Sequence, residues 1–101
     1  MARHFELELD QLRTLLIRMG SLVEEQIDCA VRAISTSDVS LARLVMDRDT
    51  KVDEFDNSID QHCMRIFALT QPVAIDLRLL MAALKINNEL ERIGDIAVNL
   101  A

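Results

Sequence analysis

The scarcity of chain-breaking residues constrains this chain more than any other feature. Its 101 residues include one Pro and two Gly, whereas a β-sandwich or barrel needs a turn signal about every 8–12 residues. Only two segments, 35–38 and 70–72, combine residues that end or begin helices. The sequence therefore predicts an all-α fold built from a few long helices.

The two breaks divide the chain into three segments of similar length. Ser, Thr and Asp at 35–38 are good helix N-caps. Pro72 stands near the start of the next segment, where its missing N–H costs little. We predict helices over about residues 4–35, 38–69 and 72–101, each about 45 Å long at the helical rise. Short connections between such helices predict one domain over 1–101, an antiparallel three-helix bundle running up-down-up.

Apolar side chains recur every three or four residues, as expected for helix faces that pack in a core. The first helix carries Phe5, Leu9, Leu12, Leu16, Met19, Val23 and Ala30, interrupted by Gln26. The third helix carries one stripe of Leu79, Ala83, Ile86, Leu90, Ile93, Ala97 and Leu100, and a second of Val73, Leu77, Leu80 and Leu84. Two stripes on one helix predict contact with two partner helices.

Composition excludes several classes of function. The net charge of −6 disfavours binding to a phosphate backbone, and the three aromatic residues, all Phe, provide no stacking platform for single strands. The longest apolar run, residues 79–84, is too short to span a bilayer, and no secretory signal opens the chain. No catalytic Ser/His/Asp order, P-loop or CxxC motif is present. We therefore expect a cytoplasmic protein that does not bind nucleic acid.

Carboxylates line one face of the predicted second helix. Asp49, Asp53, Asp56 and Asp60 recur at spacings of four and three, and like charges four residues apart destabilise a helix. On the third helix, Glu91 and Asp95 continue the line of the Val73–Leu84 stripe, where apolar residues would be expected. Such a face is easier to explain if a cation binds to it.

The two sets of carboxylates also fall at one level of the bundle. If the chain folds back near residue 70, the pairs Asp49/Asp53 and Glu91/Asp95 differ in height by about 4.5 Å. Four carboxylates without a His suit a hard cation with oxygen ligands.

The alternative interpretation of these residues is a solvated acidic face. Arg92 is placed to pair with Asp95 and with Glu89. Arg48 and Lys51 are placed to screen Asp49 and Asp53. His62 falls on an apolar stripe, and a hydrogen-bonded bundle histidine is the favoured interpretation over a metal ligand.

Two segments of the chain resemble a known family. Gln71–Arg78 (QPVAIDLR) and Glu89–Asp95 (ELERIGD) are similar to the signature of the first repeat of PhoU proteins. The resemblance implies two three-helix repeats, of which this chain holds the first and ends inside a helix. It also implies an acidic metal-binding motif on two helices of each repeat, which here is Asp49, Asp53, Glu91 and Asp95. The bound metal would be an iron cluster or another divalent cation such as Zn, Mg or Mn.

The resemblance further implies a regulatory function without catalysis. PhoU-like proteins link the phosphate ABC transporter to a sensor histidine kinase and repress the phosphate-starvation response when phosphate is sufficient. The implied partners are the transporter ATPase and the kinase, so the chain would meet the membrane only through them. A half-length chain is expected to form a homodimer or higher oligomer. The alternative function is a structural helical oligomerisation module whose acidic stripes are solvated and bind no metal.

Overall fold

The computed structural model consists of three long helices, which confirms the predicted all-α fold. It describes the backbone of residues 2–70 and 74–100, and the side chains of 6–68 and 77–100. Helix α1 spans Ala2–Thr36, α2 Val39–Thr70 and α3 Ala74–Leu100. These bounds differ by one or two residues from the predicted ranges, and the predicted start of the third helix at Pro72 lies outside the described residues.

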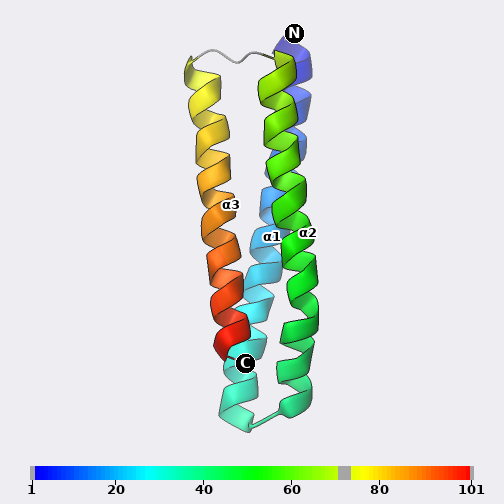
Figure 1. The fold of residues 1–101 in the computed structure, drawn as a ribbon, viewed down its shortest axis with the longest axis vertical. Coiled ribbons are helices and arrows are strands. Elements are labelled where there is room, and N and C mark those ends of the chain that lie inside the picture. Colours follow the sequence, from blue (N-terminus) through cyan, green and yellow to red (C-terminus); the bar gives the residue numbers. More distant parts are fainter. Residues whose placement is uncertain (1, 71–73, 101) are drawn as a thin grey trace.

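The helices form an elongated antiparallel bundle (Figure 1). Consecutive helices run in opposite directions, so α1 and α3 are parallel, and every pair of helices is in contact. The Cα atoms extend over 53 × 17 × 15 Å. In the described part of the chain, no helix is both long and apolar enough to cross a membrane.

The connection between α1 and α2 satisfies the backbone groups that both helices leave unpaired. Ser37 adopts a left-handed conformation with φ of 53°, and its N–H donates to the carbonyl of Ile34 at 3.4 Å. The N–H of Asp38 donates to the carbonyl of Ala33 at 2.9 Å, which completes a Schellman-type ending. Asp38 then caps α2, because its Oδ1 accepts the N–H of Leu41 at 3.1 Å.

The core runs along the axis in two clusters of buried residues. The larger one comprises Leu12, Met19, Val23, Val52, Ile59, Cys63, Ile66, Leu80 and Ala83, and the smaller one Ala30, Val45 and Ala97. Gln26, the polar interruption of the first stripe, is fully buried near the smaller cluster. Its Nε2 donates to the carbonyl of Val45 at 2.7 Å, so this side chain ties α1 to α2.

His62 is a hydrogen-bonded bundle histidine, as favoured from the sequence. Its Nε2 lies 3.0 Å from both the main-chain oxygen and the carboxylate of Glu8 on α1, and its Nδ1 lies 2.8 Å from an Arg65 nitrogen. Because Arg can only donate, Nδ1 accepts and Nε2 carries the hydrogen that faces Glu8. Nε2 thus joins α2 to α1, and Nδ1 is satisfied within α2.

One of the predicted stripes is only half buried. On α3, Ala83 and Ala97 lie in the core, whereas Leu79, Ile86, Ile93 and Leu100 are 39–50% exposed. The predicted contact of α3 with two partner helices is confirmed, and every second member of this stripe stays exposed outside those contacts. The reason is geometric, since a helix in a three-helix bundle turns only part of a wide apolar surface toward its two partners.

Candidate metal centre

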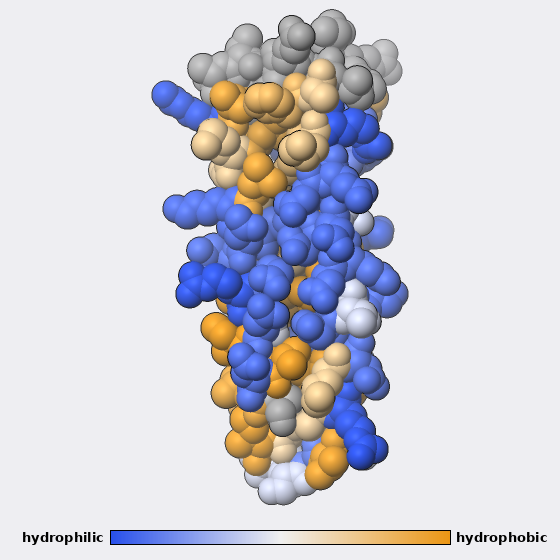
Figure 2. Space-filling model, viewed as in Figure 1, coloured by the Kyte–Doolittle hydropathy of each residue, from blue (hydrophilic) through white to orange (hydrophobic). Residues whose placement is uncertain are grey.

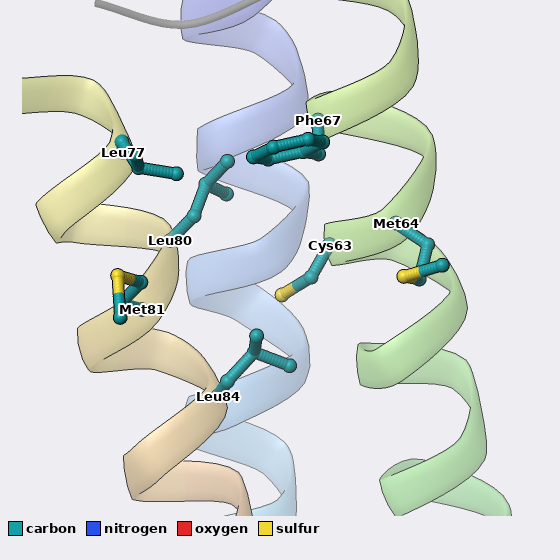
Figure 3. Close-up of a pocket in the computed structure, with 7 residues that line it drawn as sticks. All are labelled: Cys63, Met64, Phe67, Leu77, Leu80, Met81 and Leu84. Carbon is teal, nitrogen blue, oxygen red and sulfur yellow. The ribbon is translucent and has the colours of Figure 1, made fainter. Parts of the chain in front are cut away.

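The acidic residues lie along the junction of α2 and α3. Leu77, Leu80 and Leu84 of α3 line a cavity of about 210 Å³ together with Cys63, Met64 and Phe67 of α2. Figure 3 shows the three leucine side chains extending from α3 toward α2. Glu91 follows Leu84 by seven residues and so lies on the same side of α3. This side therefore faces α2, as the sequence predicted.

A hydrophilic band marks the same region on the molecular surface. Figure 2 shows polar residues across the middle of the α2–α3 face, between apolar regions nearer the two ends. Of the four predicted residues, Asp49 and Glu91 are half-buried, whereas Asp53 and Asp95 are exposed. Each helix thus contributes one half-buried and one exposed carboxylate to the predicted set.

The pKa of Asp49 is raised from its usual value of 3.8. Burial is the largest cause, followed by repulsion from Asp53 on the same helix and from Asp95 on α3. The repulsion from Asp95 crosses the helix junction, which means that the two predicted pairs are close enough to interact.

The pKa of Glu91 is raised from its usual value of 4.5 for similar reasons. Burial again comes first, then a hydrogen bond with Asp95, and then repulsion from Asp95, Asp56 and Asp53. All four predicted residues therefore belong to one electrostatically coupled group, in which each negative charge disfavours the others.

Positive side chains do not neutralise this group. Arg48 pairs with Glu25 of α1 at 3.8 Å, and Arg92 pairs with Glu89 at 3.9 Å. Across the described side chains, no Lys or Arg forms an ion pair with Asp49, Asp53, Glu91 or Asp95. The predicted pairing of Arg92 with Glu89 is confirmed, and its pairing with Asp95 is not formed.

Asp49 also holds a buried oxygen that lacks a hydrogen-bond donor. Its Oδ1 is inaccessible to solvent and has no partner among the described residues. A buried carboxylate oxygen without a donor is costly. A hard cation would satisfy it, and the all-oxygen donor set of these four residues suits such a cation.

Asp56 and Asp60 have a different environment on the same helix. Asn87 of α3 is fully buried, and its Nδ2 lies 2.7 Å from Asp56 Oδ1 and 3.1 Å from Asp60 Oδ1. This donor lowers the pKa of Asp56, although burial and repulsion from Asp60 raise it more. The amide thus gives these carboxylates a partner that the four predicted residues lack. In the sequence Asn87 only shares a helix line with Glu91, and its role depends on contacts made in the fold.

The four carboxylates do not converge on a single point. In the described part of the chain, no three His, Cys, Asp or Glu side chains are arranged as metal ligands. The structure therefore brings the predicted residues to one junction and couples their charges, with the side chains spread along it.

Gly94 determines how closely α3 approaches α2 at this junction. A Cβ at this position would lie 3.1 Å from Val52 Cγ1. Val52 is fully buried, and in the sequence it lies between Asp49 and Asp53. A contact of this length is tighter than ordinary van der Waals packing. The absence of a side chain at Gly94 therefore lets the two acidic pairs lie side by side.

Substitution of Gly94 by Ala is expected to lose the stabilisation that Ala normally brings to a helix. Gly20 is the matched control, because nothing lies within 4 Å of a Cβ added there. We expect Gly20→Ala to raise the free energy of unfolding by up to about 1 kcal/mol. The free energy of unfolding of Gly94→Ala should be at least about 1 kcal/mol lower than that of Gly20→Ala. Denaturant unfolding at one protein concentration measures both. Equal stabilisation by the two variants would contradict a tight helix contact at Gly94.

Comparison with known proteins identifies the family of this chain. Residues 16–101 match the model of the PhoU domain. The phosphate-specific transport system accessory protein PhoU of Edwardsiella tarda is 47% identical over 92% of this chain, and that of Escherichia coli is 44% identical over 92%. The crystal structure of PhoU from Pseudomonas aeruginosa superposes with a TM-score of 0.93 at 42% identity over 95% of this chain.

The match covers only part of each relative. The chain spans 38% and 39% of the Edwardsiella and Escherichia proteins and 46% of the Pseudomonas chain. Similarity in sequence and in structure nonetheless extends over nearly the whole of this chain. The chain therefore belongs to the PhoU family.

Proposed function

We propose that this chain regulates phosphate uptake and phosphate-starvation signalling in the cytoplasm, without catalysing a reaction. It would link the ATPase of a phosphate ABC transporter to a sensor histidine kinase and repress the response when phosphate is sufficient. The observation that supports this proposal most strongly is the 42% identity and TM-score of 0.93 to a PhoU structure over 95% of the chain.

The same proposal assigns a metal to the α2–α3 junction. Asp49, Asp53, Glu91 and Asp95 would hold an iron cluster or another divalent cation, such as Zn, Mg or Mn. Support comes from the buried Asp49 oxygen without a donor and from the coupled charges of the four residues. The cation would neutralise the repulsion across the junction and hold α2 and α3 together at this level. In this role it orders a surface that partners contact and takes part in no reaction.

The alternative function, a helical oligomerisation module without metal, rests on a separate observation. Asp53 and Asp95 are exposed, and no three carboxylates of the described chain converge as ligands. In that case divalent cations would leave the stability of the bundle unchanged.

Binding to the two implied partners tests the regulatory role. The purified chain is expected to bind the transporter ATPase or the cytoplasmic part of the kinase from the same organism, in a biosensor assay with immobilised partner. An unrelated acidic three-helix protein of similar size serves as the control for charge. Absence of binding to both partners, with and without added Mn²⁺ or Fe²⁺, would contradict the proposal.

A further inference from the structure

The cavity between α2 and α3 forms an apolar groove beside the acidic group. Its floor includes Cys63 and Leu80, which are 3% and 2% exposed. Its rim includes Phe67, Met64 and Met81, which are 56%, 71% and 61% exposed. Figure 3 shows Phe67 and Leu80 extending toward each other from the two helices, with Met64 and Met81 on opposite sides. We call this cavity and its rim the apolar α2–α3 groove.

Carboxylates lie at the end of the groove that points toward the middle of the bundle. Asp60 precedes Cys63 by three residues and Met64 by four, so it lies on the groove side of α2, one turn away. Its charge reaches the floor of the groove, because burial raises the pKa of the Cys63 thiol to about 11 and repulsion from Asp60 contributes to this rise. Asp56 lies one turn further along α2. Neither residue belongs to the proposed metal ligands, so a bound metal would leave their charges in place.

We propose that the apolar α2–α3 groove binds an amphipathic helix of a partner protein, whose apolar side chains fill the groove and whose Lys or Arg side chains lie over Asp56 and Asp60. The inference depends neither on the metal nor on the identity of the regulatory partners proposed above.

The apolar lining selects a helix over an extended peptide. The described side chains that line the groove offer only hydrocarbon and sulfur groups, so an extended segment would bury main-chain N–H and C=O groups without partners. A helix pairs these groups internally. The groove also lies between two neighbouring antiparallel helices (Figure 1), where a further helix can pack as in a four-helix bundle. Met64 and Met81 have flexible side chains that adapt to apolar groups of different shape.

Charge selects a basic partner. The carboxylates of Asp56 and Asp60 attract Lys and Arg, and no Lys or Arg is among the described residues that line the groove. Arg78 and Lys85 are exposed farther around α3, on its outer side. Carboxylates beside the groove repel anionic lipid. A second copy of this chain would bring its own net charge of −6.

The length of the groove sets the length of the partner helix. Phe67 and Asp56 are 11 residues apart on α2, or about 16 Å at the helical rise. A helix of about 15 residues therefore covers both the apolar groove and the two carboxylates.

Fluorescence anisotropy with a labelled synthetic peptide tests the proposal. The probe is an amphipathic helical peptide of about 18 residues, with Leu on one face and Lys on the other. A peptide with Glu in place of every Lys is the control for charge. The wild-type chain is expected to bind the Lys peptide saturably with a micromolar Kd, and the Glu peptide at least about tenfold more weakly. Asp56→Asn with Asp60→Asn is expected to weaken binding of the Lys peptide severalfold.

Met81→Glu separates binding in the groove from general attraction between opposite charges. This variant adds a negative charge, which would strengthen non-specific binding of the Lys peptide, yet it is expected to weaken binding at least about tenfold because it places a charge on the apolar rim. Ile86→Glu is the matched control, since Ile86 is 49% exposed on the same helix and does not line the groove. It should bind the Lys peptide at least as tightly as the wild type, and helicity by circular dichroism should be unchanged in both variants.

Three outcomes would overturn the proposal. The first is a wild-type chain that does not bind the Lys peptide at several hundred micromolar. The second is an equal effect of Met81→Glu and Ile86→Glu on peptide binding. The third is a wild-type oligomer that Met81→Glu converts to monomers in light scattering, because a second copy of the chain would then occupy the groove.

Discussion

Asp49→Asn combined with Glu91→Gln is expected to lower the affinity of this chain for divalent metal at least tenfold. The two residues are the half-buried members of the acidic group and lie on opposite helices, so their replacement removes one inner carboxylate from each side of the junction. Tenfold is a lower bound, since even residues that only hydrogen-bond to the metal ligands commonly change metal affinity by a factor of ten or more. Helicity should be unchanged, because both substitutions nearly preserve side-chain shape.

Elemental analysis of protein purified without chelator, followed by titration with Fe²⁺, Mn²⁺, Zn²⁺ and Mg²⁺, measures this loss. The matched control is Glu24→Gln with Asp28→Asn, which removes two exposed carboxylates from α1 at the same spacing as Glu91 and Asp95. Asp56→Asn with Asp60→Asn tests the neighbouring pair that Asn87 contacts. Equal metal content in the wild type and in the Asp49/Glu91 variant would remove these residues from any site.

The number and type of helices could be predicted because each break carries its own local chemistry. The capping residue Asp38 acts through neighbouring atoms, so its role can be inferred from sequence alone. The extent of burial along α3 could not be predicted in this way. The spacing of Ala83, Ile86 and Ile93 shows that they share a broad face, but how much of that face is covered depends on how many helices surround it. A bundle of three covers Ala83 and leaves Ile86 and Ile93 exposed.

The acidic group was predictable to the level of helix faces and no further. Angle and register placed Asp49 and Glu91 at one junction, and both have a pKa that Asp53 and Asp95 help to raise, which agrees with that placement. The directions of individual side chains are not encoded in spacing, because long carboxylate side chains have several rotamers of similar energy. The contact of Asn87 with Asp56 could not be foreseen either, since it depends on the direction of both side chains across the helix junction.

Acidification from pH 7 toward the usual carboxyl pKa values of 3.8 and 4.5 is expected to raise the stability of the metal-free chain. The pKa values of Asp49, Asp56 and Glu91 are raised in the folded state, by burial first and by neighbouring carboxylates second. The folded chain therefore binds protons more readily than the unfolded chain, in which these groups regain their usual pKa values of 3.8, 3.8 and 4.5. The ionised carboxylates destabilise the folded chain fully at pH values above the raised pKa values. This destabilisation is lost as the pH falls through the raised pKa values toward the usual ones.

Bound metal should produce the same relief at pH 7. A cation that binds only the folded state at a free concentration of 100 times its Kd adds about 2.7 kcal/mol, which corresponds to roughly 10 °C or more in Tm for a domain of this size. Thermal melts in EDTA and in Mn²⁺, at pH 7 and pH 5, separate the two effects. The metal-induced shift should be smaller at pH 5, because protons and cations compete for the same oxygens.

In the Asp49→Asn, Glu91→Gln variant, the metal-free protein should be more stable than the wild type at pH 7 and should respond less to both acid and metal. If acid lowered the Tm of the metal-free wild type over this range, the carboxylates at the junction would not repel one another in the folded chain, and the reason for placing a cation between them would disappear.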